Sequence, residues 1–308
     1  KKKIKIRKTI LWQIKKDNKI YMKMISASLV KELRELTGVG IMECKQALVE
    51  SEGDLQLAIE LLRKSSGDKA IKKAERTAAE GIIAVFSNGL TACMVEVNCE
   101  TDFVAKDESF IEYAEEVVNK LSNNTNVSLE KLMEGDLEEK RKRLIQNLGE
   151  NIQVRRIAKT DEIADNVGLY LHTNKKIASI VSLVGGDEIT AKDIAMHISA
   201  TDPIAVSSED ISKPIIEKER EIFQSQQADT GKSPDIIEKI VDGKIHKFLS
   251  EVSLIEQDFV KDPEIKVKLL LKQNNAEVKS FKRFLVGEGI EIERKDFAAE
   301  VISQIEEV

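Results

Sequence analysis

The sequence predicts an α+β fold: an N-terminal three-helix bundle, duplicated α/β core subdomains with small antiparallel sheets, an inserted antiparallel helical hairpin and a C-terminal helix. Three observations predict it. Apolar residues recur at helical spacing between residues 26 and 66, a hairpin–helix–helix–strand unit occurs twice, and its second copy contains an insertion with helical stripes. The length of 308 residues suits two or three domains with real hydrophobic cores.

Charge is divided unevenly along the chain. Residues 1–23 carry ten Lys or Arg and one acid, so the remaining chain has 38 basic and 53 acidic residues and a net charge of −15. An acidic body cannot release the counterions that supply most of the affinity for DNA or RNA. We therefore expect a protein partner and no nucleic acid.

Residues 1–23 are expected to be a basic extension, non-native or disordered, with Met24 as the natural start. The extension is rich in Lys and free of Ser, unlike an organellar transit peptide, and it lacks the apolar core of a secretory signal. The expected location is the cytoplasm, with the organellar matrix as the alternative if this extension is a targeting segment. Apolar stretches such as residues 177–184 are far shorter than the ~20 residues that cross a bilayer, so no membrane partner is expected.

Residues 24–66 are predicted to form the three-helix bundle. Its helices are marked by Leu29, Leu33 and Leu36, then by Met42, Ala47 and Leu48, then by Leu55, Ala58, Ile59 and Leu62. Glycines separate the three stripes at Gly38, Gly40 and Gly53. Such a bundle leaves one or two apolar residues exposed in its first loop, which is how UBA-like modules bind partners. The Lys-rich residues 67–77 follow as a linker or a solvated helix.

An internal duplication organises the rest of the chain. Three apolar positions recur at a shift of 86, namely Ala92, Val95 and Val97 as Ala178, Val181 and Leu183. Four positions recur at a shift of 127, namely Leu144, Asn147, Arg155 and Arg156 as Leu271, Asn274, Lys282 and Arg283. Each copy is predicted to contain a hairpin, a helix, a second helix and a strand, with the first helices at residues 106–121 and 191–200. Core subdomain 1 spans residues 78–160, and core subdomain 2 spans residues 161–202 and 252–286.

The two shifts differ by about 41 residues, which places an insertion in the second copy at residues 203–251. Apolar stripes on both sides of a polar loop predict an antiparallel helical hairpin, or coiled-coil arm. A two-helix arm has little core of its own, so it is a candidate surface for a partner or for homodimer formation. Residues 287–308 form a C-terminal module.

Catalytic motifs are nearly absent. Residues 230–233 (Thr-Gly-Lys-Ser) mimic the end of a phosphate-binding loop, but the required first glycine is Gln226 and no strand precedes it. The histidines lie far apart without a carboxylate at metal-ligand spacing, and His197 shares a helix face with Ile194, as a packed core histidine does. We expect no catalytic residue, no cofactor and no metal.

The three cysteines, Cys44, Cys93 and Cys99, are expected to be free thiols. Their odd number and the lack of a repeated Cys-x-x-Cys argue for a reducing compartment and against a zinc site. Cys44 has no His nearby in the sequence and lies at helical spacing with Leu48, so a place in the core is expected.

Residues 98–106 (Asn-Cys-Glu-Thr-Asp-Phe-Val-Ala-Lys) join the first hairpin to its helix and allow two interpretations. In the structural one, Thr101 or Asp102 caps the helix and Phe103 packs onto Phe110 as a hydrophobic staple. In the functional one, the acid and the aromatic form a wedge aimed at a partner. The equivalent stretch of the second copy (Gly-Gly-Asp-Glu) has no aromatic, which favours the wedge because the shared fold does not demand a Phe.

Several motifs resemble those of the translation elongation factor Ts family. The resemblance is carried by MISASLVKELRELTGVGIMECK from Met24, VNCETDFVA from Val97, IAMH from Ile194, GEGI from Gly287 and DFAAE from Asp296. It covers the chain from Met24 to the C-terminus, and the first 23 residues have no counterpart in it. Ile41 stands where the family commonly has methionine.

The resemblance implies a guanine nucleotide exchange factor, without enzymatic activity, that binds the GTPase elongation factor Tu and promotes GDP release in translation elongation. In that family an acid–aromatic pair enters beside the nucleotide site and disturbs magnesium coordination. The implied contacts with elongation factor Tu are Arg34, Ile41, Met42 and Lys45 in the bundle, Thr101, Asp102, Phe103 and Val104 in the wedge, and Leu148, Gly149 and His172 beyond it.

Two other classes of protein stay open on the residues alone. A general adaptor would use the bundle to bind ubiquitin-like partners, but it leaves the duplicated body unexplained. A thiol enzyme built on Cys44 or Cys99 would need a His close in space.

Overall fold

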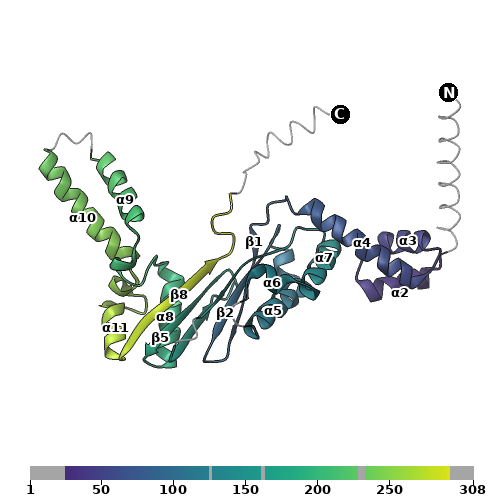
Figure 1. The fold of residues 1–308 in the computed structure, drawn as a ribbon, viewed down its shortest axis with the longest axis horizontal. Coiled ribbons are helices and arrows are strands. Elements are labelled where there is room, and N and C mark those ends of the chain that lie inside the picture. The colour runs from purple at the N-terminus through teal and green to yellow at the C-terminus, as the bar shows by residue number, and fades with distance from the viewer. Residues whose placement is uncertain (1–24, 125–126, 161–163, 228–232, 292–308) are drawn as a thin grey trace.

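The computed structural model describes residues 25–124, 127–160, 164–227 and 233–291. Figure 1 shows the parts arranged along the long axis, with the N-terminal bundle at one end, two small sheets with their covering helices in the middle, and a helical hairpin at the other end. This mixture of helices and antiparallel sheets confirms the predicted α+β class. The predicted N-terminal extension and C-terminal helix lie outside the described residues. Within the described ranges, no helix combines the length and apolarity needed to cross a membrane.

The bundle consists of three helices, α2 (Ala27–Thr37), α3 (Ile41–Glu50) and α4 (Leu55–Lys73). Capping residues set its boundaries. The Ser26 hydroxyl accepts a hydrogen bond from the Leu29 N–H at 3.2 Å, and the Asp54 carboxylate accepts one from the Leu57 N–H at 3.0 Å. Gly38 ends α2 in the left-handed region, with φ of 70°. The predicted stripes form the core, in which Leu33, Cys44, Leu48 and Ala58 are fully buried.

Helix α4 runs beyond the predicted end of the bundle and carries the chain into the body. Residues 67–77 were expected to be a linker or a solvated helix, and the helix continues to Lys73. It is not solvated on every side, because Ser66 and Ala70 are only 2% and 3% exposed and Ala70 belongs to the core of the first subdomain. The boundary predicted at residue 66 therefore falls inside a helix.

The first subdomain contains a three-stranded sheet and the helices on one of its faces. Its elements are β1 (Glu80–Ser87), β2 (Ala92–Cys99), the 3-10 helix η1 (Val104–Lys106), α5 (Glu108–Ser122), α6 (Leu129–Met133), α7 (Asp136–Leu148) and β3 (Gln153–Lys159). The strand order is β1-β2-β3, with antiparallel pairing throughout. Helix α5 buries Phe110, Val117 and Leu121 against the sheet.

The second subdomain has the same order of elements with an insertion. Its elements are β4 (Asn166–Leu171), β5 (Ile177–Gly185), α8 (Glu188–Thr201), η2 (Ser208–Asp210), α9 (Lys213–Ser225), α10 (Pro234–Val252), η4 (Leu254–Glu256), β6 (Asp258–Phe259), β7 (Asp262–Lys266), α11 (Val267–Gln273) and β8 (Ala276–Leu285). The main sheet has the order β4-β5-β8, and β6 pairs with β7 in a two-stranded sheet.

The pairing registers confirm the predicted duplication and its shift of 86, but they correct the shift of 127. Arg156 lies opposite Glu96 and Ser280 lies opposite Ser182, so the last strands of the two copies are 124 residues apart. In the first sheet, the register of β2 with β3 shifts between Glu96 and Val97. In the second sheet, the register of β5 with β8 shifts between Ser182 and Leu183, the positions 86 residues later. A bulge kept at the same place in both copies shows that the repeated apolar pattern encodes the same strand geometry.

The two sheets pack face to face, and helices cover their outer faces (Figure 1). Alternate residues of β2 therefore face different layers. Val95 and Val97 lie in the cluster with α5, whereas Met94 lies in a cluster with Ile180 and Phe284 of the other sheet. All eight residues of β2 are buried as a result. Antiparallel sheets commonly have one face in solvent, and β2 has none.

The inserted arm is the predicted antiparallel helical hairpin (Figure 1). Helix α9 buries no residue, and α10 buries only Val241 and Ile245. Arg220 pairs with Asp242 at 2.7 Å between the two helices. At the base, residues 204–206 and 252–255 lie side by side and are joined by backbone hydrogen bonds.

Replacing residues 208–250 with a short Gly/Ser linker is expected to leave the duplicated body folded. The ends of the removed segment are already adjacent, so a flexible linker spans them at little cost. Circular dichroism should show loss of helix signal equal to the two helices removed. A larger loss would show that the arm belongs to the core of the body.

Candidate functional site

Residues 100–106, here called the Phe103 loop, connect β2 to α5 and present an aromatic side chain to solvent. Phe103 is 81% exposed. The alternative interpretation, with a Thr101 or Asp102 cap and a Phe103 staple, is wrong: Asp107 caps α5, accepting from the Ser109 N–H at 2.9 Å, and Phe110 is buried in the core without Phe103. The loop therefore carries a large apolar side chain for which the fold has no packing role.

The Phe103 loop is anchored below its tip. Val104 and Ala105 are buried in the first-subdomain core, so Val104, predicted to touch the partner, anchors the loop in this conformation. At the surface, the Lys106 ammonium donates to the Asp102 carboxylate at 2.7 Å. This hydrogen bond and the nearby positive charges hold the pKa of Asp102 below its ordinary value. Asp102 is thus a carboxylate beside an exposed aromatic ring.

The predicted contacts Leu148 and Gly149 lie beside the Phe103 loop. They end α7, where Gly149 takes φ of 83° as the helix cap. The next residue, Glu150, accepts a hydrogen bond from the Thr101 hydroxyl at 2.6 Å. Leu148 packs against the first-subdomain core, and Gly149 is exposed. The fold thus brings two stretches separated by about fifty residues to one surface.

His172 lies in the exposed turn between β4 and β5. Its Nδ1 accepts from the Asn174 N–H at 3.5 Å, and its ring lies edge-on to Tyr170 with centroids 6.5 Å apart. The same turn contacts the first subdomain, because the Lys175 carbonyl accepts from the Ile83 N–H at 2.7 Å and Lys176 pairs with Glu80. Glu80 lies opposite Cys99, the residue before the Phe103 loop, so this turn is at the loop's end of the sheets.

The bundle residues form a separate surface. Ile41 and Met42, at the start of α3, are 53% and 67% exposed, and Arg34 is exposed on α2 while Lys45 is half-buried. Leu36, which the helical stripe placed among the core residues, is 61% exposed. Leu36 lies outside the core of the bundle, and the prediction is wrong because periodicity alone does not show which apolar positions of a helix its neighbours cover.

Polar contacts fix this bundle surface relative to the body. Gln146 on α7 donates to the Glu43 carboxylate at 3.0 Å, and Lys69 pairs with the same group at 2.5 Å. Burial opposes the charge on Glu43, but these hydrogen bonds outweigh it and keep its pKa below the ordinary value. Gly38 lies so close to Asn147 that a Cβ would stand 2.8 Å from its Nδ2 atom. The bundle is therefore docked on α7, the helix that ends at Leu148.

Comparison with known proteins decides the family. A family model described as elongation factor TS matches residues 100–288. Elongation factor Ts of Hahella chejuensis is 53% identical over 286 residues, covering 92% of this chain and 99% of the relative. The chain belongs to the elongation factor Ts family. Elongation factor Ts of Saccharophagus degradans is 50% identical over 283 residues, covering 91% and 98%, and that of Francisella tularensis subsp. novicida is 50% identical over 290 residues, covering 92% and 99%.

The thiols of this elongation factor Ts family member are unsuited to nucleophilic chemistry. Cys44, Cys93 and Cys99 are free and buried. Burial raises the pKa of Cys93 to about 11 and that of Cys99 to about 12, so neither is a thiolate near neutral pH. His197, as predicted, is a packed core histidine: Nε2 lies 2.9 Å from Gln257 Oε1, and Nδ1 accepts from the Val260 N–H at 3.2 Å.

Other candidate sites gain no support from the structure. Most of the Thr-Gly-Lys-Ser stretch at residues 230–233 lies outside the described residues. Among those that are described, no group of three His, Cys, Asp or Glu residues is placed to hold a metal ion.

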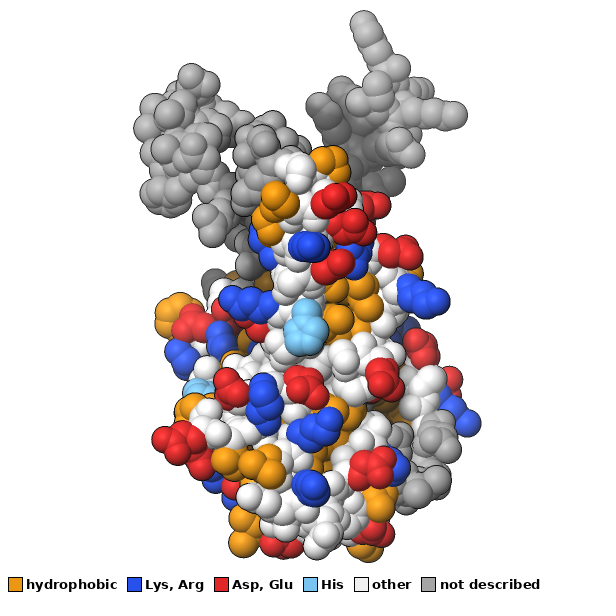
Figure 2. Space-filling model, turned by 90° about the vertical axis from the view of Figure 1, so that its left-hand side faces the viewer, with side chains coloured by type: hydrophobic (Ala, Val, Ile, Leu, Met, Phe, Trp, Pro, Cys, Tyr) orange, Lys and Arg blue, Asp and Glu red, His pale blue; other side chains and the backbone are white. Residues whose placement is uncertain are grey.

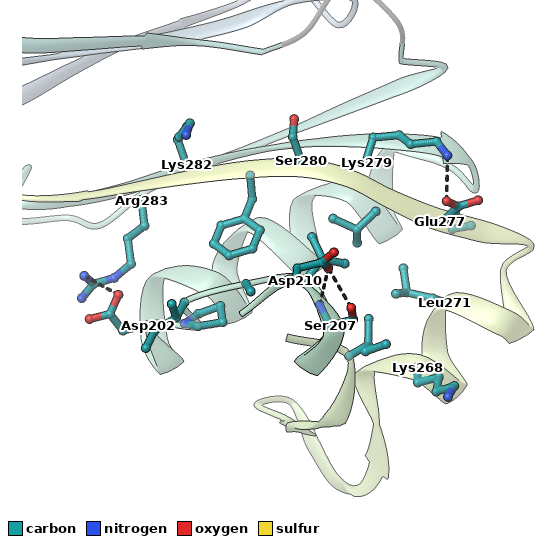
Figure 3. Close-up of a pocket in the computed structure, with 18 of the residues that line it drawn as sticks. Asp202, Ser207, Asp210, Lys268, Leu271, Glu277, Lys279, Ser280, Lys282 and Arg283 are labelled. Carbon is teal, nitrogen blue, oxygen red and sulfur yellow. Dashed lines mark hydrogen bonds and ion pairs between the residues drawn. The ribbon is translucent and has the colours of Figure 1, made fainter. Parts of the chain in front are cut away.

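A groove with a volume of about 1110 Å³ runs beside β8 (Figure 3). Its wall is formed by β8, α11 and residues 202–210. Asp202 pairs with Arg283 at 3.0 Å at one end, and Lys279 pairs with Glu277 at 2.7 Å near the other (Figure 3). None of the predicted contact residues lines this groove.

Proposed function

We propose that this chain is a guanine nucleotide exchange factor for elongation factor Tu, acting in translation elongation in the bacterial cytoplasm. The observation that carries the proposal is the 81% exposure of Phe103 on a loop that is otherwise anchored in the core. The second subdomain makes the equivalent turn with Gly185 and Gly186, so the fold is built without an aromatic there. An exposed aromatic beside a carboxylate suits insertion into a partner.

In this proposal the Phe103 loop acts on the nucleotide site while other surfaces hold the GTPase. Asp102 and Phe103 enter beside the helices that flank bound GDP and disturb magnesium coordination. Magnesium joins the protein to the β-phosphate, so a small displacement there has large electrostatic leverage. The bundle surface around Ile41 and Met42 and the contacts at Leu148, Gly149 and His172 supply affinity that does not depend on the nucleotide.

Linkage requires such a division of roles. Nanomolar GDP binding corresponds to roughly −12 kcal/mol, and fast release needs a partner that favours the nucleotide-free state. Coupling is reciprocal: the exchange factor weakens the binding of nucleotide to the GTPase, and GDP or GTP weakens the binding of the factor to the GTPase by the same ratio. This chain makes and breaks no covalent bond in the scheme, and the proposal needs neither catalytic residue nor cofactor.

The decisive measurement is release of fluorescent GDP from purified elongation factor Tu with and without this chain. Release should accelerate strongly and saturate with added chain. An unchanged release rate under conditions where the two proteins form a complex would contradict the proposal and favour the adaptor interpretation, in which the bundle binds without acting on the nucleotide.

The arm is proposed as a surface for self-association. Ile215 and Ile222 on α9 and Ile236 on α10 are 37%, 38% and 50% exposed, which a two-helix hairpin cannot avoid by itself. Figure 2, viewed from the arm's side, shows acidic and basic side chains interspersed with small apolar patches, without the single-sign patch of a nucleic-acid interface on that face. Sedimentation should show a dimer for the full chain and a monomer after replacement of residues 208–250.

A further inference from the structure

Thr101 at the start of the Phe103 loop is held at its amide, its hydroxyl and its carbonyl. Its N–H donates to Glu150 Oε2 at 2.9 Å, and its hydroxyl donates to Glu150 Oε1 at 2.6 Å. Its carbonyl accepts from the Cys99 Sγ at 3.2 Å and from the Ala105 N–H at 3.2 Å. Because the thiol of Cys99 stays protonated, it is a permanent donor in this arrangement. The backbone two residues before Phe103 is thus fixed on several sides.

The Glu150 carboxylate also contacts Glu100, and the Glu100 carboxylate in turn contacts the residue that follows Glu150. Glu150 Oε2 also accepts from the Glu100 N–H at 3.0 Å. In return, the Glu100 carboxylate accepts from the Asn151 N–H at 2.6 Å and lies 3.6 Å from the Arg76 guanidinium. Residues 100–101 and 150–151 thus exchange carboxylate-to-amide hydrogen bonds across two turns. Hydrogen bonds to a charged acceptor are stronger than neutral ones, so this reciprocal clamp is a rigid connection.

The second subdomain lacks this clamp, although it has the same fold. The strand registers of the two copies place Asn274 at the position of Glu150, and the Asn274 side-chain amide donates to the Leu270 carbonyl at 2.9 Å. The counterpart turn instead uses glycines in the left-handed region, with φ of 70° at Gly185, and a Cβ there would stand 2.1 Å from the Asn275 carbonyl oxygen. The carboxylate clamp is therefore present only in the copy that exposes an aromatic side chain.

We propose that Glu150 is a positioning residue for nucleotide exchange, which holds the Phe103 loop in its partner-ready conformation through Thr101 and Glu100. This inference rests on the proposed function and adds a residue to it. A loop that is ordered before binding does not lose its conformational entropy on binding, so more of the contact energy is left to displace the nucleotide. Glu150 itself is not among the predicted contacts with the GTPase, so it would act through Thr101 and Glu100.

The test uses Glu150→Ala in the full chain, assayed by GDP release from elongation factor Tu. The maximal release rate at saturating chain should fall about tenfold, the effect of losing one strong charged hydrogen bond. The half-saturating concentration should change less, because the bundle still binds. Glu150→Gln should keep most of the rate, since its amide oxygen can accept from both N–H groups. Glu277→Ala, which removes an exposed carboxylate from the second copy, is the control and should leave release unchanged.

Two further readouts separate positioning from general damage. Amide hydrogen exchange at Glu100 and Thr101 should speed up in Glu150→Ala while the rest of the first subdomain keeps its protection. In a Phe103→Ala background, Glu150→Ala should add little further loss, because the clamp acts through that side chain. Equal losses in both backgrounds, or an unchanged release rate with fast amide exchange at Thr101, would overturn the inference.

The failure of the proposed function would look different. If Phe103→Ala itself left GDP release unchanged, the proposed role of the loop in exchange would be wrong. This conclusion would not depend on the amide hydrogen exchange of Glu100 and Thr101 in Glu150→Ala. If Glu150→Ala does not fold, Thr101→Val removes the 2.6 Å hydroxyl contact with Glu150 and the longer 3.4 Å contact with the Val104 N–H, and it keeps the side-chain shape. It should then lower the maximal rate in the same direction by a smaller factor, and an unchanged rate would count against the clamp.

Discussion

Phe103→Ala should slow GDP release from elongation factor Tu by at least about tenfold while leaving the chain as stable as before, since truncation of an interface hot spot costs about 2 kcal/mol or more. The side chain is 81% exposed, so its removal leaves no cavity, whereas a buried Phe costs ~3 to 5 kcal/mol on truncation. The measurements are thermal unfolding of the variant alone and stopped-flow GDP release at saturating chain. Exchange should fall more than binding, because the bundle still holds the partner.

Leu90→Ala is the matched control for this experiment. Leu90 is 72% exposed in the turn between β1 and β2, at the opposite end of the hairpin from Phe103. Its truncation should leave release unchanged. Asp102→Ala should slow release in the same direction as Phe103→Ala, but less, if the Asp102 carboxylate mainly orients the loop through Lys106. A lower melting temperature for Phe103→Ala with normal exchange would mean that the assignment of the wedge is wrong.

Glu96→Ala should destabilise the body more than removal of any surface carboxylate. Glu96 is fully buried between the sheets, where its carboxylate accepts from the Arg155 and Arg156 guanidinium groups and from the Gly287 N–H at 2.9 Å. Loss of one partner from a buried ion pair costs about 3 kcal/mol or more. At roughly 2 to 4 °C per kcal/mol, the melting temperature should fall by roughly 6 to 12 °C.

The arginines freed by this change also connect the two subdomains. Arg156 pairs with Glu288 at 3.0 Å and stacks over the Phe284 ring at 4.2 Å from its centroid. The network therefore joins β2 and β3 to the segment that follows β8. Glu115→Ala, which removes an exposed carboxylate from α5, is the control and should change stability by less than about 0.5 kcal/mol.

The pH dependence of stability provides an independent check on Glu96. Burial opposes its charge, but the hydrogen bonds from Gly287 N–H and both arginines outweigh burial and hold the pKa of Glu96 below its ordinary value. A carboxyl with a lowered folded pKa stabilises above its unfolded pKa, near 4.3, and loses that contribution as the pH falls through the folded value. The difference in unfolding free energy between wild type and Glu96→Gln should thus be full at pH 7 and shrink in acid. A difference that grows in acid would contradict the assignment.

Local patterns in the sequence predicted most of the elements. Helical periodicity located the bundle, and the shift of 86 predicted the two hairpins, because a repeated apolar pattern folds into a repeated unit. The shift of 127 predicted a last strand in each copy and the insertion, although the strand pairing places those last strands 124 residues apart. The missing aromatic in the second copy predicted that Phe103 is not needed by the fold, and its 81% exposure agrees. The length of α4 was left open, because its last turns are stabilised by packing on α7 and the sheet rather than by an apolar stripe of their own.

The sequence by itself determined the α+β class, the duplication, the arm and the family motifs, because each depends on residues that are close along the chain or repeat at a regular spacing. Only the tertiary structure decided how the Phe103 loop is held and how the sheets are joined. Thr101 and its acceptor Glu150 are 49 residues apart, and Glu96 and its donor Gly287 are 191 apart. Hydrogen bonds of this kind depend on directions and distances that arise only when the sheets pack, and no local pattern of residue types specifies them.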